Sequence, residues 1–384
     1  MTNTNWMLPE GIDEFLPPQA WALESLRKDI LQHFWRCGYD LVHPPVIEYI
    51  ESLLVGTGRD FDLQTFKLVD QLSGRTLGVR ADMTPQVARI DAHQLKKDHP
   101  VRLCYLGSVL RSRPEGLFGG RNPLQLGAEL YGHTGVESDA EVLALMIETL
   151  QIAGIDEIYL DIGHVGVFRS LADCVDMTPD QSFALFELLQ RKAQSDINDF
   201  LTTVDCDSEV KKAIGALIEL NGGDDVLDIA ECVNRDSGGN FAHAITYLRE
   251  LAALIRLRFP NAELHFDLAE LRGYHYHTGV VFAAYQKGQG NEIARGGRYD
   301  EIGEAFGRAR PATGFSTDLK SLIAGRNKTD AAQEQVGTFA STPTTSDDWK
   351  TVNQMRAGGK RVICELPGQS GGPSEQGCKD TLTF

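Results

Sequence analysis

Two short stretches of the chain concentrate side chains that can bind or transform a small polar molecule. The first, LRGYHYHTG, runs from Leu271 to Gly279, and the second, RGGRYD, runs from Arg295 to Asp300. One arginine, four aromatic or imidazole rings and two glycines fall within the first stretch. That is too polar for an ordinary buried strand and too aromatic for a solvent loop. The composition favours a site in which a small polar ligand lies between rings and an arginine.

Arg272, at the start of the first stretch, has two interpretations. A single arginine between apolar flanks is most often one half of a structural ion pair. Here Gly273 permits close backbone approach, and a guanidinium group is well suited to a ligand carboxylate. We favour ligand binding.

His275 and His277 alternate, so they point to opposite faces if this stretch is a strand. A metal site would need a third histidine or cysteine at ligand spacing, which the sequence lacks. We expect one of the two to line a pocket and the other to pack, and we expect no metal. In the second stretch, Gly296–Asp300 is predicted to be a tight glycine turn, and a simple turn before a helix is its ordinary interpretation.

Three further groups of polar residues are candidates for the same site. Asp82 and Thr84 close a strand and open a helix, where they can cap the helix or receive a ligand ammonium group. Gln125 and Glu129 are four apart on one predicted strand and therefore share a face. Placed in a pocket, Glu129 can accept the N–H of a polar ring. The loop that carries Arg111, Arg113 and Arg121 is either a charged surface loop or an anion-binding one.

Helices and strands alternate around these residues in an order that predicts an α+β fold with a mainly antiparallel sheet flanked by helices. Helices are expected at 19–36, after Thr84-Pro85, at 138–153, 241–258 and 349–356. Strands are expected at 39–43, as a hairpin within 64–80, and at 101–110, 123–132, 157–162, 263–268, 278–285 and 361–366.

The pattern divides the chain into four parts. Residues 1–170 and 261–325 form the two halves of one core, and 171–260 is a helical insertion between them. Residues 326–384 are expected to be a linker, reaching into the 340s, followed by a small C-terminal remnant with a Gly/Ser/Pro-rich tail.

Composition is typical of a soluble globular protein: 384 residues, 42% hydrophobic and 24% charged. The N-terminus does not resemble a signal peptide and no apolar run is long enough to span a membrane, so a cytoplasmic protein is expected. The seven cysteines lack C-x-x-C spacing and indicate reduced thiols. A net charge of −17 opposes binding to a polyanion such as nucleic acid.

In this order, the motifs resemble the histidyl-tRNA synthetases, which are class II aminoacyl-tRNA synthetases, over roughly residues 8–323. GIDEFLP is similar to that family's G-x-x-D-x-L-P start, and RADMTP to its R-P-E-x-T segment. The helix and strand at 19–45 resemble the dimer-forming motif 1, and YLGSVLRSRPEGLFGGRNPLQLGAELYG resembles motif 2. LRGYHYHTG and RGGRYD are similar to the two histidine-specific motifs.

The resemblance implies a histidine pocket. Asp82, Thr84 and Gln125 would face the α-amino group of the ligand, and Arg272 its carboxylate. Glu129, His277 and Tyr299 would surround the imidazole. The full set expected to bind histidine is Asp82, Thr84, Arg111, Gln125, Glu129, Arg272, Tyr276, His277 and Tyr299.

The chain departs from the synthetases where they bind ATP. Arg111-Ser112-Arg113 stands where the family has Arg-x-Glu, so a carboxylate that reads the nucleotide is missing. Lys320 and Ser321 stand where motif 3 ends in Glu-Arg, and the lost arginine holds the folded ATP. Its loss should cost several orders of magnitude in adenylyl transfer, which rests on positioning and charge neutralisation. The family's Asp-Tyr-Tyr is replaced by His275-Tyr276-His277.

A kept amino-acid pocket beside broken ATP motifs resembles the regulatory subunits of ATP phosphoribosyltransferase, a family of synthetase paralogues. That resemblance implies a protein with no catalytic residues and no cofactor. It would be a homodimer within a hetero-oligomer, partnered by a short-form catalytic subunit, with histidine as effector and without tRNA. The alternatives are an active histidyl-tRNA synthetase or other adenylating ligase, and a sensor for a different amino-acid derivative.

Overall fold

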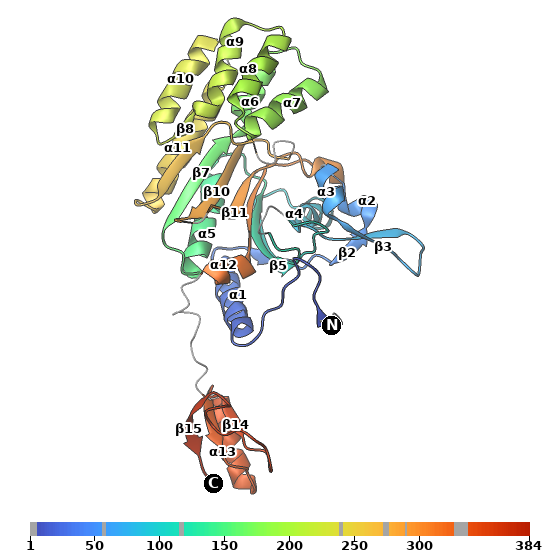
Figure 1. Ribbon diagram of the computed structural model, residues 1–384, viewed down its shortest axis with the longest axis vertical. Coiled ribbons are helices and arrows are strands. Elements are labelled where there is room, and N and C mark those ends of the chain that lie inside the picture. The colour runs from blue at the N-terminus through green and yellow to red at the C-terminus, as the bar shows by residue number, and fades with distance from the viewer. Residues whose placement is uncertain are drawn as a thin grey trace, which may run out of the picture. The chain divides into compact units, whose positions relative to one another are not determined.

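The computed structural model describes residues 6–55, 59–114, 119–237, 241–271, 276–288, 290–325 and 337–384. It divides into two compact units (Figure 1). The first unit contains Met1–Phe15 and Leu23–Gly325, and the second contains Leu16–Ala22 and Arg326–Phe384.

A nine-stranded sheet forms the centre of the first unit, in the order β1-β5-β6-β12-β11-β10-β7-β9-β8. From β5 through β7 every neighbouring pair is antiparallel, whereas β1 pairs with β5, and β9 with β7, in parallel. The predicted α+β class with a mainly antiparallel sheet is therefore confirmed. The strands are Asp40–Leu41 (β1), Val101–Ser108 (β5), Leu124–Tyr131 (β6), Ile158–His164 (β7), Asn221–Gly222 (β8), Glu263–Asp267 (β9), Val280–Gln286 (β10), Glu292–Arg298 (β11) and Ala312–Asp318 (β12).

Helices cover one face of this sheet. Helix α5 (Val136–Ile152) packs against β6, β11 and β12, and α11 (Ala242–Arg258) packs against α5 and β7. Helix α1 spans Gln19–Arg36, as the sequence predicts. Its buried residues recur at helical spacing, and the last of them, Phe34, meets Phe315 of β12 edge-on, with 6.1 Å between ring centroids. Helix α12 (Leu319–Gly325) follows β12 directly.

A small antiparallel sheet and three short helices, the last of which continues as a π-helical segment, follow β1 in the chain. The sheet has the order β2-β4-β3, and β3 and β4 form the predicted hairpin. Arg80 follows this sheet, and its buried guanidinium donates to the backbone oxygens of Pro44 (2.6 Å) and Ser108 (2.9 Å). These bonds tie the small sheet to the end of β5. The elements are Ile47–Tyr49 (β2), Ile50–Leu53 (α2), Arg59–Gln64 (α3), Phe66–Val69 (β3), Thr76–Val79 (β4) and Thr84–Arg89 (α4), which continues as a π-helical segment, Ile90–Leu95.

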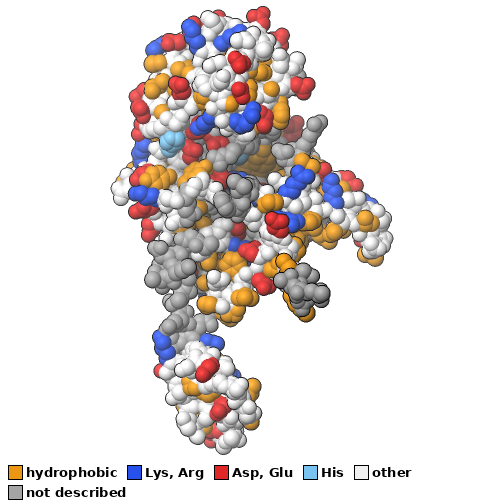
Figure 2. Space-filling model, in the orientation of Figure 1, with side chains coloured by type: hydrophobic (Ala, Val, Ile, Leu, Met, Phe, Trp, Pro, Cys, Tyr) orange, Lys and Arg blue, Asp and Glu red, His pale blue; other side chains and the backbone are white. Residues whose placement is uncertain are grey.

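Between β7 and β9 the chain is almost entirely helical, as its sequence predicts (Figure 1). Figure 2 shows acidic and basic side chains interspersed over the visible face of this helical region, without a continuous basic stripe. The boundaries at 171 and 260 remain predictions. The helices are Val165–Ala172 (α6), Pro179–Gln190 (α7), Gln194–Thr203 (α8), Ser208–Ala216 (α9), Asp225–Ser237 (α10) and α11.

The second unit contains a three-stranded parallel sheet in the order β14-β13-β15 and one helix. Ala340, Val352 and Val362 form its small core. The prediction of a linker was wrong for part of that segment, because GTFA, Gly337–Ala340, is a buried strand. The tail was wrong too, because Cys378 onward pairs with that strand. Both strands are short and lie among glycine, serine and threonine, which hides their pattern. The elements are Gly337–Ala340 (β13), Ser346–Ala357 (α13), Val362–Cys364 (β14) and Cys378–Leu382 (β15).

Candidate functional site

Glu129 lies near the middle of β6 and has a buried carboxyl group with two tyrosine partners. The hydroxyl of Tyr105, on the neighbouring strand β5, donates to Oε1 at 2.9 Å. The hydroxyl of Tyr299, which follows β11, donates to Oε2. On the other side of β6, the residue paired with Glu129 is Gly314, which leaves room for the carboxylate. Residues on β5 and directly after β11 therefore hold the Glu129 carboxyl group in place.

Burial raises the pKa of Glu129 to about 8, because the charged form loses its hydration. The hydrogen bonds from Tyr299 and Tyr105 act in the opposite direction, and the charge of Asp82 adds to the rise. A ligand that brings an N–H donor or a positive charge would therefore favour the ionised carboxylate. This is the electrostatic condition for reading a polar ring such as imidazole.

A second group of polar side chains lies beside this carboxyl group. The amide of Gln125 donates from Nε2 to Asp82 Oδ1 (2.8 Å) and accepts at Oε1 from the backbone N–H of Met83 (2.8 Å). Thr84 donates its backbone N–H to Asp82 Oδ1 (2.8 Å), and its hydroxyl lies 2.9 Å from that of Tyr105. A continuous chain of hydrogen bonds thus runs from Gln125 through Asp82, Thr84 and Tyr105 to Glu129.

Aromatic and imidazole rings border the Glu129 carboxyl group. Tyr276 stacks on Tyr299 with centroids 4.9 Å apart, and the His277 ring meets Tyr276 edge-on at 5.3 Å. Gly297 lies under the His277 ring, where a Cβ atom would come within 2.9 Å of Nε2. The hydroxyl oxygen of Tyr276 is buried and has no hydrogen-bond partner among the described residues.

Of the two arginines predicted to bind a ligand, only Arg111 lies within the described residues. Arg111 follows the end of β5 and points its Nε at the backbone oxygen of Ala81, 3.5 Å away and one residue before Asp82. Arg272 and its neighbour His275 lie outside the described residues. The structure thus brings together Asp82, Thr84, Gln125, Glu129, Tyr276, His277 and Tyr299, with Arg111 near the Asp82 end. That these residues bind a ligand remains a prediction.

RGGRYD is not the predicted glycine turn. Its first four residues belong to β11, and Gly296 and Gly297 are there because their neighbours approach closely. Its second arginine, Arg298, is buried in an ion pair with Asp139 of α5, with Nε 3.0 Å from Oδ2. The motif therefore combines a structural arginine with a pocket tyrosine.

Tyr105 is a site residue that no sequence motif indicates. It faces Gly127 across the β5–β6 ladder, and the absence of a side chain there lets its ring reach toward Glu129, two residues further along β6. A glycine midway between Gln125 and Glu129 was the available signal. Its use requires the strand register, which the sequence alone does not supply.

The segment that corresponds to motif 3 holds its polar groups in local contacts. Lys320 Nζ pairs with Asp13 Oδ1 at 3.1 Å, and the Ser321 hydroxyl donates to Asp318 Oδ2 at 3.0 Å. Asp318 also accepts the backbone N–H groups of Leu124 and Lys320. These contacts join the N-terminal GIDEFLP segment, β6 and the start of α12.

This sheet, with its buried acid and tyrosines, defines a class II synthetase-like protein. The histidyl-tRNA synthetase family model matches residues 11–322. A histidyl-tRNA synthetase from Nostoc shares the fold with a TM-score of 0.77 at 22% identity, over 97% of this chain and 88% of that one.

Proteins more similar in sequence assign the chain to one family within this class. Residues 337–384 match the ATP phosphoribosyltransferase subunit HisZ C-terminal domain. The ATP phosphoribosyltransferase regulatory subunits of Thioalkalivibrio sulfidiphilus and Alkalilimnicola ehrlichii are each 52% identical to this chain. The matches cover 100% and 99% of the chain and 97% and 95% of those proteins. The chain belongs to the family of ATP phosphoribosyltransferase regulatory subunits.

A solved structure agrees with this assignment. An ATP phosphoribosyltransferase regulatory subunit/histidyl-tRNA synthetase from Bacillus halodurans has a TM-score of 0.84 at 27% identity, over 99% of this chain and 98% of that one. Among the described residues, no helix has the length and apolar character needed to cross a bilayer.

Proposed function

We propose that this chain is a non-catalytic, cytoplasmic subunit that binds a short-form ATP phosphoribosyltransferase catalytic subunit, is required for its activity and confers feedback inhibition by histidine. The observation that carries the effector assignment is the buried Glu129 carboxyl group between the hydroxyls of Tyr105 and Tyr299. Among the described residues no basic side chain bonds this carboxyl group, and a buried acid of that kind is costly in a chain that has no ligand for it.

Each part of histidine has a chemical counterpart in this site. Glu129 would accept the imidazole N–H, and the Tyr276 hydroxyl can bond the second ring nitrogen. Asp82 and Gln125 would receive the α-amino group. A guanidinium would bind the carboxylate, and Arg272 and Arg111 are the candidates for this role.

The contacts around the motif 3 segment support the absence of adenylation. Neither Lys320 nor Ser321 carries the guanidinium that binds ATP in the synthetases. In this structure Lys320 pairs with Asp13, and the Ser321 hydroxyl is bonded to Asp318. Lysine and arginine are not equivalent at a site that holds a polyphosphate, because only arginine offers a planar fork of donors. The chain would then bind the amino acid without activating it.

Regulation requires only that histidine bind one state of the complex more tightly than the other. Linkage makes coupling between binding events reciprocal. If histidine changes the affinity between the two subunits by some factor, the catalytic subunit changes the affinity for histidine by the same factor. We expect a homodimer of this chain within the hetero-oligomer, and no tRNA.

The decisive experiment is co-purification with a short-form catalytic subunit, assayed with and without histidine. The pair should be active and inhibited by histidine. Glu129→Ala and Arg272→Ala should each abolish the inhibition while the complex still assembles. Lys320→Ala is a matched control, because it removes an ion pair at the motif 3 segment and should leave inhibition unchanged. Full inhibition in both pocket variants would mean that histidine binds elsewhere.

The match to the synthetase family over residues 11–322 keeps an active synthetase as the second candidate. ATP–pyrophosphate exchange separates the two. Exchange that depends on histidine and runs at synthetase-like rates would overturn the regulatory proposal, and its absence supports it. Calorimetric titration with histidine tests the effector itself, since a sensor for another amino-acid derivative would give no heat.

A further inference from the structure

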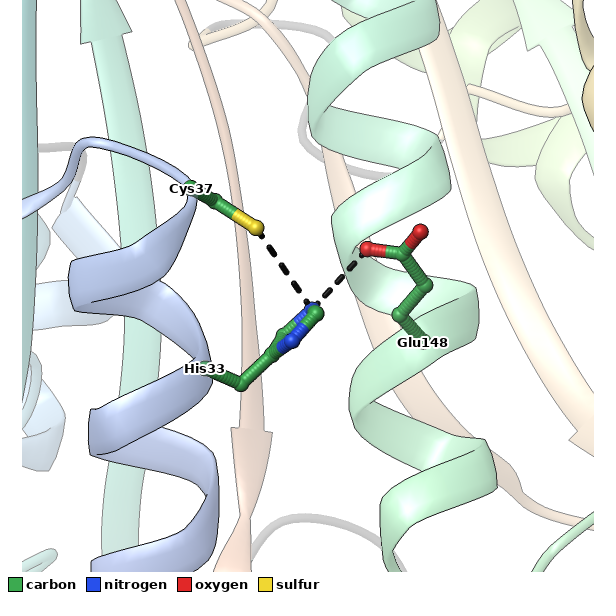
Figure 3. A group of neighbouring side chains, drawn as sticks. All are labelled: His33, Cys37 and Glu148. Carbon is green, nitrogen blue, oxygen red and sulfur yellow. Dashed lines mark hydrogen bonds and ion pairs between the residues drawn. The ribbon is translucent and has the colours of Figure 1, made fainter.

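A histidine, a cysteine and a glutamate point toward one another at the end of α1 (Figure 3). His33 lies in the last turn of α1, and Cys37 is the first residue after it, so the two share a face. Glu148 comes from α5. His33 Nε2 lies 3.6 Å from Cys37 Sγ and 2.9 Å from Glu148 Oε2. The group is on the face of the sheet that α1 and α5 cover, where Phe34 meets Phe315.

We propose that His33, Cys37 and Glu148 bind a Zn²⁺ ion. The three groups supply one nitrogen, one sulfur and one oxygen, which is a donor set typical of zinc. All three ligand atoms lie within 4.8 Å of one another. The ion would join the C-terminal end of α1 to α5.

The two distances from His33 Nε2 are close to those around a tetrahedral ion, and the third pair, Cys37 Sγ and Glu148 Oε2, lies within 4.8 Å and would have to approach to about 3.5 Å. With zinc bonds of about 2.3 Å to sulfur and about 2.0 Å to nitrogen, the 3.6 Å between Sγ and Nε2 corresponds to an angle of roughly 110°. The separation of 2.9 Å between Nε2 and Oε2 is shorter than the tetrahedral edge by about half an ångström. Glu148 is only partly buried, so its side chain has room to adjust.

The surroundings provide an outer shell and an open position. Arg258 of α11 donates to Glu148 Oε1 at 2.7 Å, which leaves Oε2 directed at His33. Ligating carboxylates are commonly held by such outer hydrogen bonds. A cavity of about 380 Å³ adjoins the group and is lined by Cys37, Tyr39, Arg102, Glu141 and Arg258, among others. Water from this cavity can complete a four-coordinate site.

The charges and protons balance without any further reactant. Thiolate and carboxylate together neutralise the charge of Zn²⁺, and His33 binds as neutral imidazole. Zinc binding to the Cys37 sulfur replaces the thiol proton, which leaves to solvent.

The only other such group of three among the described residues is less suited to a metal. Asp161, Asp267 and Glu270 are all acidic. The ammonium group of Lys192 already pairs with Asp267 at 2.6 Å, which supplies a cation to that cluster. The group at His33 also has a basic side chain bonded to it, Arg258 on Glu148 Oε1, but it offers nitrogen and sulfur donors beside the carboxylate, and the thiol gives it a spectroscopic signature.

The test uses the untagged, full-length chain, stripped with a chelator and titrated with Co²⁺ as the probe. We expect one tightly bound Co²⁺ per chain, sulfur-to-cobalt charge-transfer absorption, visible bands of a tetrahedral ion, and displacement by one equivalent of Zn²⁺. Cys37→Ser should abolish the charge-transfer absorption. Glu148→Gln, which preserves shape, should weaken binding at least tenfold.

Cys232→Ser and Cys174→Ser are matched controls, because both thiols are exposed and neither belongs to the group. Circular dichroism of each variant verifies folding. The proposal is overturned if wild-type protein takes up no stoichiometric cobalt, or if the charge-transfer absorption persists in Cys37→Ser or disappears in the control variants. Histidine binding is measured separately, so failure here leaves the proposed function intact.

Discussion

Gly314 lies directly opposite Glu129 in the ladder between β6 and β12, and a Cβ atom at position 314 would overlap the Glu129 carboxylate. The buried acid therefore depends on a missing side chain one strand away. This relationship turns a glycine of the motif 3 segment into a determinant of the proposed ligand pocket.

Gly314→Ala should displace the Glu129 carboxylate and break its bonds to Tyr105 or Tyr299. We expect histidine affinity to fall at least tenfold and the free energy of unfolding to fall by about 1–3 kcal/mol, the usual cost of overpacking. Calorimetric titration and urea unfolding measure the two effects. Gly215→Ala on α9, where a Cβ meets only ordinary contacts, is the control and should lower neither the affinity nor the free energy of unfolding. Wild-type affinity in Gly314→Ala would show that the pocket tolerates a moved carboxylate.

Glu129→Gln should change how stability depends on pH. The pKa of Glu129 is about 8 in the folded chain against an ordinary value of 4.5, so this group favours folding most at acidic pH. Its contribution is fully present below the unfolded pKa and is lost as pH rises through the folded pKa. Relative to the non-titrating glutamine variant, the wild-type free energy of unfolding should fall by up to about 1.4 kcal/mol per pH unit between about pH 5 and pH 8.

Urea unfolding of both proteins at several pH values measures that difference. Glutamine keeps an acceptor for one tyrosine hydroxyl and places an NH2 donor beside the other, and neither change titrates, so the pH dependence of the difference reports the charge. Parallel pH profiles for the two proteins would mean that Glu129 is already ionised in the folded chain without a ligand.

The sequence predicted much of this architecture because helical and strand periodicity follow burial on one face. The 19–36 helix is an example, since its apolar residues repeat at helical spacing. Resemblance to a family placed Asp82, Gln125 and Glu129 near one another, which no local pattern can do. The bonds that hold the site depend on register: Tyr105 reaches Glu129 only because Gly127 lies between them.

Other features could not be predicted because their sequence signals are weak or ambiguous. The β13 strand, GTFA, has only four residues and lies among threonine and serine, so it reads as a linker. Arg298 and Arg295 look alike in RGGRYD, yet only Arg298 faces α5 and its buried Asp139. Which of two arginines is structural depends on strand alternation and on the helix behind the sheet, neither of which the motif contains.

Arg298→Ala should be strongly destabilising because it leaves a buried carboxylate without its counter-ion. Arg298 bonds Asp139 and the Ser138 hydroxyl, and the Asp139 side chain is fully buried. Removing one partner of a buried pair costs about 3–5 kcal/mol. Arg295→Ala on the same strand, whose pair with Glu292 is solvent-exposed, should cost less than about 1 kcal/mol. Urea unfolding compares the two, and equal costs would contradict the structural role given to Arg298.

His164→Asn should protect the fold against acid. Burial lowers the pKa of His164 to about 4, with the nearby charges of His243, Arg169 and Arg298 acting in the same direction. Its Nδ1 accepts the backbone N–H of Gly166 at 3.0 Å and so caps α6, which only the neutral ring can do.

The stability that neutral His164 contributes is fully present above its unfolded pKa of 6.5 and is lost as pH falls through the folded value of about 4. Over that interval the wild type should lose about 2–3 kcal/mol relative to His164→Asn, which keeps an acceptor for the cap but does not titrate. Unfolding measured along an acid pH series tests this. His99→Asn, at an exposed position, should follow the wild type, and a wild-type profile in His164→Asn would assign the acid sensitivity to other groups.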